Sequence, residues 1–227
     1  MSNKEATEKR FEEARDEAGA RGMLVVVSSP SGGGKGTLIR RVLKTVPNLS
    51  YSVSFTTRDP RAGEINGRDY HFVSIETFEE MKRTGGLLEW ALVHSNLYGT
   101  SRAQVKRELD EGLDIVLEID VQGAEIVRQI EPEAVTVFIL PPTFEILRAR
   151  LTARGSELPA DLELRLRNAS REVLRYAEFD YVIINDDADR AAEQLASVVY
   201  AERARRNRQE RIIRRVLASF PPASAAV

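Results

Sequence analysis

The stretch Ser28-Ser29-Pro30-Ser31-Gly32-Gly33-Gly34-Lys35-Gly36-Thr37 decides the fold of this chain. The apolar run at residues 23–27 predicts a buried strand before it, and the spacing of the apolar residues after it predicts a helix with one buried face: Leu38, Ile39, Val42 and Leu43. Between a strand and a helix, glycines let backbone N–H groups surround a phosphate chain, and the helix N-terminus adds a partial positive charge. The stretch therefore predicts a phosphate-binding loop in which Lys35 contacts the transferring phosphate.

The loop departs from the common pattern G-x-x-x-x-G-K-[ST] in two places. Ser29 stands at the first glycine, and Gly36 stands where a hydroxyl side chain usually follows the lysine, with Thr37 one position later. Because that hydroxyl usually binds Mg²⁺, we expect the metal to be held chiefly by nucleotide phosphates and water. The alternative is a glycine-rich turn without a ligand.

The composition indicates a soluble globular protein of 227 residues, with 42% hydrophobic and 30% charged residues. The formal net charge of −2 gives no general attraction to nucleic acid or to an anionic membrane. The absence of cysteine excludes disulfides and thiolate metal sites. No apolar run approaches the roughly 20 residues of a membrane span. We therefore expect a cytoplasmic protein with neither nucleic acid nor membrane as a partner.

Strands and helices alternate over residues 101–200, which predicts an α/β fold with a parallel sheet between helices. Together with residues 23–49 this region forms the predicted core. A mixed-charge arm at 1–22 and a basic helical extension with a tail at 201–227 lie outside it. The predicted core strands are 115–120, 134–140 and 181–184, and the predicted helices are 101–112, 121–130, 143–153, one that opens at Asp161 after a break at 155–159, and a single helix at 188–218.

Residues 50–100 predict a small β-rich insertion with one helix. Tyr51, Val53 and Phe55 alternate with polar residues, the pattern of one half-buried strand. The other predicted elements are a returning strand at 69–73, a helix that starts at a capping box of Thr77 and Glu80 and stops at 85–86, and a strand at 87–91.

Two arginines and two tyrosines of the insertion are candidates for phosphate binding. Arg58 and Arg61 share a polar turn, and a guanidinium binds phosphate with two parallel hydrogen bonds. Tyr70 and Tyr98 stand at the ends of predicted strands, where phenolic hydroxyls can donate to phosphate oxygens. The ordinary alternatives are a solvated pair of arginines and tyrosines that only pack.

Three carboxylates, Glu89, Glu118 and Asp120, lie within apolar strand patterns. A buried carboxylate needs hydrogen-bond donors, because burial without a partner costs several kcal/mol. Guanine presents adjacent N1–H and N2–H₂ donors, whereas adenine has an acceptor at N1. Pairing with a local arginine or with Mg²⁺ is an equal alternative from the residues alone.

Arginines bracket the break at residues 155–159: Arg148, Arg150, Arg154, Arg165, Arg167, Arg171 and Arg175. An arginine-rich helix face is ordinarily just solvated. Beside a phosphate loop, however, these residues suggest a lid that closes over a triphosphate and neutralises charge in the transition state. The two histidines, His71 and His94, are not at metal-ligand spacing.

Taken together, these pieces resemble the guanylate kinase family from about residue 23 to about residue 200. The resemblance is carried by Ser-Pro-Ser-Gly-Gly-Gly-Lys at 29–35, Ser-Val-Ser-Phe-Thr-Thr-Arg-Asp-Pro-Arg-Ala-Gly-Glu-Ile-Asn-Gly-Arg-Asp-Tyr at 52–70, Leu-Glu-Trp-Ala at 88–91, Tyr-Gly-Thr at 98–100, Glu-Ile-Asp-Val-Gln-Gly at 118–123 and Ile-Ile-Asn-Asp-Asp at 183–187. It implies a P-loop NTPase-type parallel sheet flanked by helices, with a small β-rich GMP-binding insertion at 50–100 and a helical lid at about 150–166.

The resemblance also implies a role for each matching residue. On the GMP side it implies Ser54 at guanine O6, Glu89 and Asp120 at guanine N1 and N2 with Glu118 beside them, Thr100 near the base, and Arg58, Arg61, Tyr70 and Tyr98 at the phosphate. On the ATP side it implies the loop residues Ser29, Pro30, Ser31, Gly32, Gly33, Gly34, Lys35, Gly36 and Thr37, with Asn185 near the adenine. The implied catalytic cations are Lys35, Arg58, Arg150, Arg154 and Arg165.

The implied reaction transfers the γ-phosphoryl group of ATP to GMP, or to dGMP, with Mg²⁺, in purine nucleotide metabolism. The ionised phosphate of GMP needs no general base, so the implied work of the protein is positioning and charge stabilisation. Two alternatives keep the fold: a related kinase that acts on a ribose bisphosphate, which has no use for Ser54, Glu89 and Asp120 together, and a non-catalytic interaction domain. The choice between monomer and homo-oligomer stays open.

Overall fold

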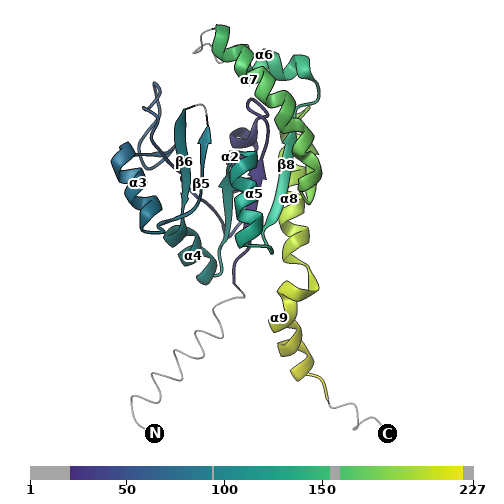
Figure 1. Ribbon diagram of the computed structural model, residues 1–227. Coiled ribbons are helices and arrows are strands. Elements are labelled where there is room, and N and C mark those ends of the chain that lie inside the picture. Colours follow the sequence, from purple (N-terminus) through teal and green to yellow (C-terminus); the bar gives the residue numbers. More distant parts are fainter. Residues whose placement is uncertain (1–20, 94, 154–158, 222–227) are drawn as a thin grey trace.

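The computed structural model describes residues 21–93, 95–153 and 159–221. Its central sheet is parallel and has the strand order β2-β7-β1-β8-β9. Helices cover both faces of this sheet (Figure 1), which confirms the predicted α/β class. The strands are β1 (Leu24–Ser28), β2 (Leu49–Tyr51), β7 (Asp114–Glu118), β8 (Val135–Leu140) and β9 (Tyr181–Ile184).

Two helices pack against each face of the sheet. Helices α2 (Lys35–Thr45) and α8 (Ala188–Arg203) share one core cluster with Val25 and Val27. Helices α4 (Arg102–Asp110) and α5 (Val121–Ile130) share the other cluster with Leu24 and Val26. Because both faces of β1 are buried, the strand is a continuous apolar run rather than an alternating one.

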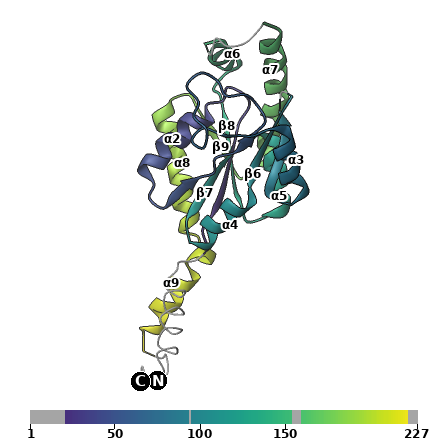
Figure 2. The ribbon, with the colours of Figure 1, turned by 90° about the vertical axis from the view of Figure 1, so that its left-hand side faces the viewer.

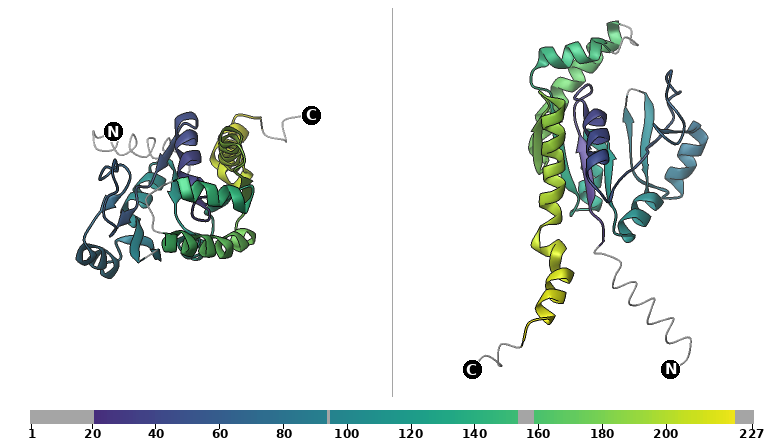
Figure 3. Two further views of the ribbon diagram at one scale, coloured as in Figure 1. Left: turned by 90° about the horizontal axis from the view of Figure 1, so that it is seen from above. Right: turned by 180° about the vertical axis from the view of Figure 1, so that it is seen from behind.

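The insertion forms a second sheet of order β4-β3-β6-β5, beside the core (Figures 1 and 3). Its elements are β3 (Phe55–Thr56), β4 (His71–Phe72), β5 (Leu87–Val93), β6 (Asn96–Ser101) and helix α3 (Ile75–Arg83). Phe78 of α3 is fully buried against Gly99, where a Cβ would lie 3.0 Å from the Phe78 ring. The helix thereby holds β6 in place.

The single strand predicted around Tyr51 is wrong, because the chain changes sheets there. Strand β2 ends at Tyr51 in the core sheet, Ser52 N–H donates to the Val116 carbonyl at 3.0 Å, and β3 then joins the insertion sheet. The insertion therefore begins after Tyr51. The burial is also the reverse of the expected pattern: Ser52, Ser54 and Thr56 are buried, and the apolar residues between them only half-buried.

Two further details of the insertion differ from expectation. Strand β4 pairs parallel with β3 instead of returning antiparallel, because the long connection carries the chain back before β4 begins. Helix α3 starts one turn early: Ser74 has an extended backbone and its hydroxyl accepts from Thr77 N–H at 3.2 Å. Thr77 is thus inside the helix, while Gly85 (φ +70°) ends it as predicted.

Helices α6 (Phe144–Ala153) and α7 (Pro159–Glu172) lie beyond the carboxyl ends of the core strands (Figures 1 and 2). They pack on each other through Leu147, Leu151 and Ala169. Helix α7 begins at Pro159 rather than Asp161, since proline suits the first turn of a helix. The predicted break at 155–159 falls mostly outside the described residues, and so does Arg154. The 3₁₀ helix η1 (Val173–Glu178) follows α7 directly.

The single helix predicted over 188–218 is wrong as well, because it divides into α8 and α9 (Arg206–Ala218). The backbone at Arg205 is extended, with φ −57° and ψ 136°. Arg203, in the last turn of α8, bonds Asp114 at 2.6 Å and the Pro47 carbonyl at 2.8 Å, which fastens that turn to the core. Helix α9 then projects away from the body (Figure 2).

The predicted N-terminal arm up to residue 20 and the last residues of the tail, 222–227, lie outside the described residues. Within the described ranges, no helix is long and apolar enough to cross a membrane.

Candidate active site

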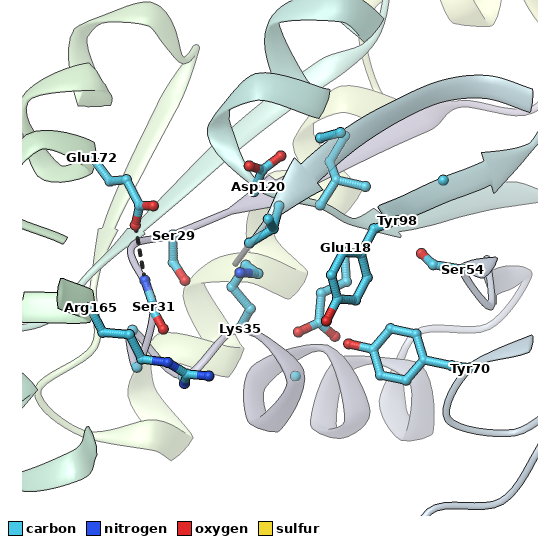
Figure 4. Close-up of a pocket in the computed structure, with 18 of the residues that line it drawn as sticks. Ser29, Ser31, Lys35, Ser54, Tyr70, Tyr98, Glu118, Asp120, Arg165 and Glu172 are labelled. Atoms are coloured by element: carbon cyan, nitrogen blue, oxygen red, sulfur yellow. Dashed lines mark hydrogen bonds between the residues drawn. The ribbon is translucent and has the colours of Figure 1, made fainter. Parts of the chain in front are cut away.

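One pocket lies between the phosphate loop, the insertion and α7 (Figure 4). It opens at the carboxyl ends of β1 and β7, where ligands bind in open parallel sheets. Most of the predicted site residues line it. Its lining comprises Ser29, Ser31, Gly32, Gly33, Gly34, Lys35 and Gly36 of the loop, Ser54, Arg61, Tyr70, Glu89, Ala91, Val93, Tyr98 and Gly99 of the insertion, Glu118 at the end of β7 with Ile119 and Asp120 after it, and Arg165 and Glu172 of α7.

Among the predicted site residues that the structure describes, six are not part of that lining: Pro30, Thr37, Arg58, Thr100, Arg150 and Asn185. Pro30 shapes the loop, because its carbonyl accepts from Gly33 N–H and from the Ser29 hydroxyl, both at 2.9 Å. Thr37 lies in the first turn of α2, where its N–H donates to the Gly34 carbonyl at 3.1 Å. Both residues support the loop from outside the pocket.

The loop ends at Gly34, the residue before α2, with φ +96°. Only glycine adopts this conformation without strain. No side chain caps the helix start, so the first N–H groups of α2 remain available to an anion. Lys35 is the first helical residue, and its side chain extends into the pocket (Figure 4). This arrangement is an anion site with a mobile cation beside it.

Two residues brace the loop from behind. Asn185 is buried, and its side-chain amide donates to the Gly33 carbonyl at 2.8 Å. Arg150 of α6 donates through Nη2 to the Asn185 carbonyl at 2.9 Å. Its other terminal nitrogen, Nη1, lies beside Gly34 and has no hydrogen-bond partner among the described residues. Arg150 thus keeps a donor next to the phosphate loop.

Glu118 lies beside Gly36. A Cβ built at Gly36 would be 3.1 and 3.2 Å from the two Glu118 carboxylate oxygens. The Tyr51 hydroxyl donates to Glu118 Oε2 at 3.3 Å, and burial, then the Glu118 charge, raises the pKa of this phenol. A carboxylate therefore occupies the space next to the lysine that a hydroxyl side chain usually fills.

Glu89 of β5 is a buried carboxyl, with only 4% of the residue exposed. Its Oε1 accepts from the Thr100 hydroxyl at 2.5 Å. Burial raises its pKa to about 7, with Thr100 opposing and Asp120 reinforcing the effect. The second oxygen, Oε2, faces Gly123, where a Cβ would approach to 2.6 Å. Glu89 is thus held in place, with Thr100 as its one hydrogen-bond donor among the described residues.

Asp120 is not part of a strand, contrary to the prediction. Strand β7 ends at Glu118, and Asp120 is the N-cap of α5, where Oδ1 accepts from Gly123 N–H at 2.9 Å. The reason is local: an aspartate before a helical run caps it by accepting from an N–H of the first turn. Oδ2 accepts from Gln122 at 3.0 Å. The cap fixes the carboxylate at the rim of the pocket.

Arg58 is held by the insertion itself. Its Nη2 lies 2.9 Å from both carboxylate oxygens of Glu64, and its guanidinium lies over the ring of Tyr70 at 5.4 Å. Glu64 also accepts from Arg61 N–H at 2.8 Å, and Arg61 lines the pocket. Tyr70 and Tyr98 meet edge to face, with ring centroids 5.9 Å apart. One acidic residue therefore organises both arginines of this turn.

The structure adds two polar residues that the sequence did not single out. In the sequence Tyr51 is only one member of a half-buried strand pattern, and its partner Glu118 is 67 positions away. Glu172 stands at the end of an arginine-rich helix, where the sequence pattern does not indicate a contact with the loop. Its carboxylate accepts from Ser31 N–H of the loop at 3.1 Å. Arg165, from the same helix, lines the pocket. Neither Tyr51 nor Glu172 carries a local signal for these contacts.

A family model described as guanylate kinase matches residues 21–202. Curated relatives include a guanylate kinase of Thiobacillus denitrificans, 50% identical over 188 residues, an alignment that covers 83% of this chain and 90% of that protein. A guanylate kinase of Aromatoleum aromaticum is 48% identical over 191 residues, covering 84% and 94%.

Among solved structures, a guanylate kinase from Anaplasma phagocytophilum is similar, with a TM-score of 0.73 and 33% sequence identity. The alignment covers 87% of this chain and 96% of that one. The family model spans the phosphate loop, the insertion and α7, and it ends before α9.

Proposed function

This chain belongs to the guanylate kinase family, and on that premise we propose that its pocket binds ATP and GMP together. The reaction transfers the γ-phosphoryl group of ATP to GMP and yields ADP and GDP. One observation carries the proposal: the phosphate loop lines the same pocket as Glu89, a buried carboxylate whose one donor among the described residues is Thr100. A phosphate loop alone binds many nucleotides, whereas Glu89 and Asp120, which line the same pocket, select the base.

On the acceptor side, Glu89 and Asp120 accept from guanine N1–H and N2–H₂. These are the donors that a buried Glu89 needs. Ser54 is buried at the pocket wall and faces the guanine O6 in this arrangement. Thr100 acts through its bond to Glu89. Adenine presents an acceptor at N1 and would leave the carboxylates unsatisfied, which is the basis of the proposed selectivity.

The phosphate of GMP sits between the insertion and the loop. Arg61, Tyr70 and Tyr98 line this part of the pocket, and Arg58 stands directly behind Tyr70. Arg58 is already paired with Glu64, so in the complex its guanidinium interacts with both the Glu64 carboxylate and the GMP phosphate. This pairing pre-organises the guanidinium at little entropic cost.

In the transfer step a GMP phosphate oxygen attacks the γ-phosphorus in line, and the bond to the β–γ bridging oxygen breaks, leaving ADP. No proton has to be removed, because the attacking oxygen is already ionised. Lys35, Arg150 and Arg165 stabilise the charge on the equatorial and leaving oxygens. Arg154 is proposed for the same role from the family resemblance. Helices α6 and α7, which carry Arg150 and Arg165, form the proposed lid.

The residues around Gly36 fit a Mg²⁺ held mainly by phosphates. No group of three or more His, Asp or Glu residues that could hold a metal occurs in the described part of the chain. Glu118 is the carboxylate beside Gly36, placed to bind metal-bound water. When bound, Mg²⁺ neutralises phosphate charge. Tyr51 keeps the Glu118 carboxylate oriented.

We further propose that the enzyme accepts dGMP, because no contact assigned above involves the ribose 2′-hydroxyl, and that it acts in purine nucleotide metabolism in the cytoplasm. Its oligomeric state stays undecided between monomer and homo-oligomer.

A coupled ADP-release assay with GMP, dGMP, AMP, UMP and ribose 1,5-bisphosphate, measured side by side, tests the function. We expect turnover with GMP and dGMP only. Turnover with ribose 1,5-bisphosphate instead would refute base recognition, and no turnover with any acceptor would favour an interaction domain. Repeating the assay without added metal tests the Mg²⁺ requirement.

A further inference from the structure

Glu172 makes a contact that the reaction above does not explain. It is the last residue of α7, and its Oε2 accepts from the backbone N–H of Ser31 at 3.1 Å (Figure 4). The two residues are 141 positions apart, so this bond ties α7 to the phosphate loop. Burial raises the pKa of Glu172, while the Ser31 amide and the nearby Lys35 act in the opposite direction.

A carboxylate at this place opposes the binding of a polyanion. Like charges separated by a few ångströms repel, and they repel more strongly away from water. Glu172 lines the pocket that takes the triphosphate, with Asp120 as a further negative neighbour. Because this repulsion opposes ATP binding, the hydrogen bond between Glu172 and Ser31 must have a favourable effect of another kind.

The geometry of α7 indicates what this effect is. Arg165 precedes Glu172 by seven residues, which is two helical turns, so both side chains project from one face of α7 about 10 Å apart along its axis. Both line the pocket, and Figure 4 shows them on the same side of the phosphate loop. Between them on the helix, Ala169 packs against Leu147 and Leu151 of α6. Apolar packing of this kind fixes the tilt of a helix less strictly than a directional hydrogen bond.

We propose that Glu172 is a positioning residue, which fastens the end of α7 to the phosphate loop at Ser31 and thereby sets where the Arg165 guanidinium stands over the transferring phosphate. The inference rests on the proposed function, because it assigns Glu172 an effect on phosphoryl transfer through Arg165.

A double-mutant cycle tests this proposal. We compare the wild type with Glu172→Ala, Arg165→Ala and the double variant, with kcat for GMP as the readout. We expect Glu172→Ala to lower kcat by roughly 10-fold or more, since a misplaced catalytic group costs one to two orders of magnitude. In the Arg165→Ala background the same change should alter kcat less than about twofold, because the two residues act as one unit.

Two matched variants separate positioning from stability and charge. Glu172→Gln keeps an oxygen acceptor for Ser31 N–H and should retain most of kcat. Glu163→Ala removes an exposed glutamate from the same helix and should leave kcat unchanged. If Glu172→Ala does not fold, Glu172→Asp, which withdraws the carboxylate by one methylene, takes its place in the cycle.

Equal losses from Glu172→Ala with and without Arg165 would overturn the proposal, and so would a Gln variant as damaged as the Ala variant. Failure of the proposed function is a different result, because the wild type itself would then show no turnover with GMP.

Discussion

The substitution Glu89→Gln should make the protein more stable while it impairs the reaction with GMP. Glu89 is buried with Thr100 as its one donor in the described part of the chain, and burial raises its pKa from 4.5 to about 7. Below pH 4.5 the carboxyl is protonated in both the folded and the unfolded chain. Between pH 4.5 and about 7 the folded state holds a proton that the unfolded state has released. Stability is therefore lost as pH rises through this window.

The magnitude follows from the width of the window. About 2.5 pH units at about 1.4 kcal/mol per unit give roughly 3 kcal/mol, which the wild type loses relative to the Gln variant between pH 4.5 and pH 7. Above pH 7 the difference should become constant. Glutamine has no charge to bury, and its side-chain oxygen can still accept from Thr100.

Urea unfolding of both proteins from pH 4 to pH 9 measures this difference directly. The result is the slope of the difference in unfolding free energy against pH. A change in packing that does not depend on pH shifts this curve up or down without changing its slope. Glu76→Gln is the control, because hydrogen bonds to the Glu76 backbone and to Ser74 lower the pKa of Glu76. Its difference curve should be flat from about pH 4.5 upward, because a lowered pKa confines the stability change at Glu76 to pH values below 4.5.

Saturating GMP adds a functional readout to the same experiment. Guanine N–H donors favour the ionised carboxylate, so bound GMP should reduce the slope between pH 4.5 and pH 7. A difference curve that is flat without ligand would refute the assigned burial of the charge. A slope that GMP leaves unchanged would refute Glu89 as the acceptor of the guanine donors.

Three further substitutions test the site. Lys35→Ala should lower kcat by roughly 100- to 1000-fold with an unchanged circular dichroism spectrum, because one cation at the transferring phosphate is lost; near-normal turnover would contradict the loop assignment. Asp120→Asn keeps an N-cap acceptor, so the free energy of unfolding measured by thermal denaturation should change by less than about 1 kcal/mol. Its kcat/KM for GMP should fall about 10- to 100-fold, and an equal fall for ATP would argue against base recognition. Gly123→Ala places a Cβ 2.6 Å from Glu89 Oε2 and should raise the KM for GMP about 10-fold in steady-state kinetics, with ATP little affected.

Features encoded in neighbouring residues were predictable from the sequence. The position of the glycine-rich loop between β1 and α2, the start of α4 next to Ser101 and the strand β9 all agree with the structure. In each case the signal is short-range: glycines between an apolar run and a helix, a hydroxyl before a helical pattern, or an apolar run between polar residues.

Features decided by distant partners were not predictable. The end of α8 depends on the bond from Arg203 to Asp114, which lies 89 positions earlier. Ser52 and Ser54 look like the exposed face of a strand, but they are buried because the chain crosses from one sheet to the other beside the pocket. The Tyr51–Glu118 and Glu172–Ser31 contacts likewise join segments that only the fold brings together.

The contact between Gly36 and Glu118 makes the two positions epistatic. Restoring the usual hydroxyl with Gly36→Ser would put a Cβ about 3.1 Å from Glu118, so the carboxylate that Tyr51 holds would have to shift to make room for it. The common form of the loop is thus not a neutral single step away for this chain. We therefore expect Gly36→Ser alone to perform worse than the wild type, and a change at Glu118 that makes room for the new side chain to offset part of the loss.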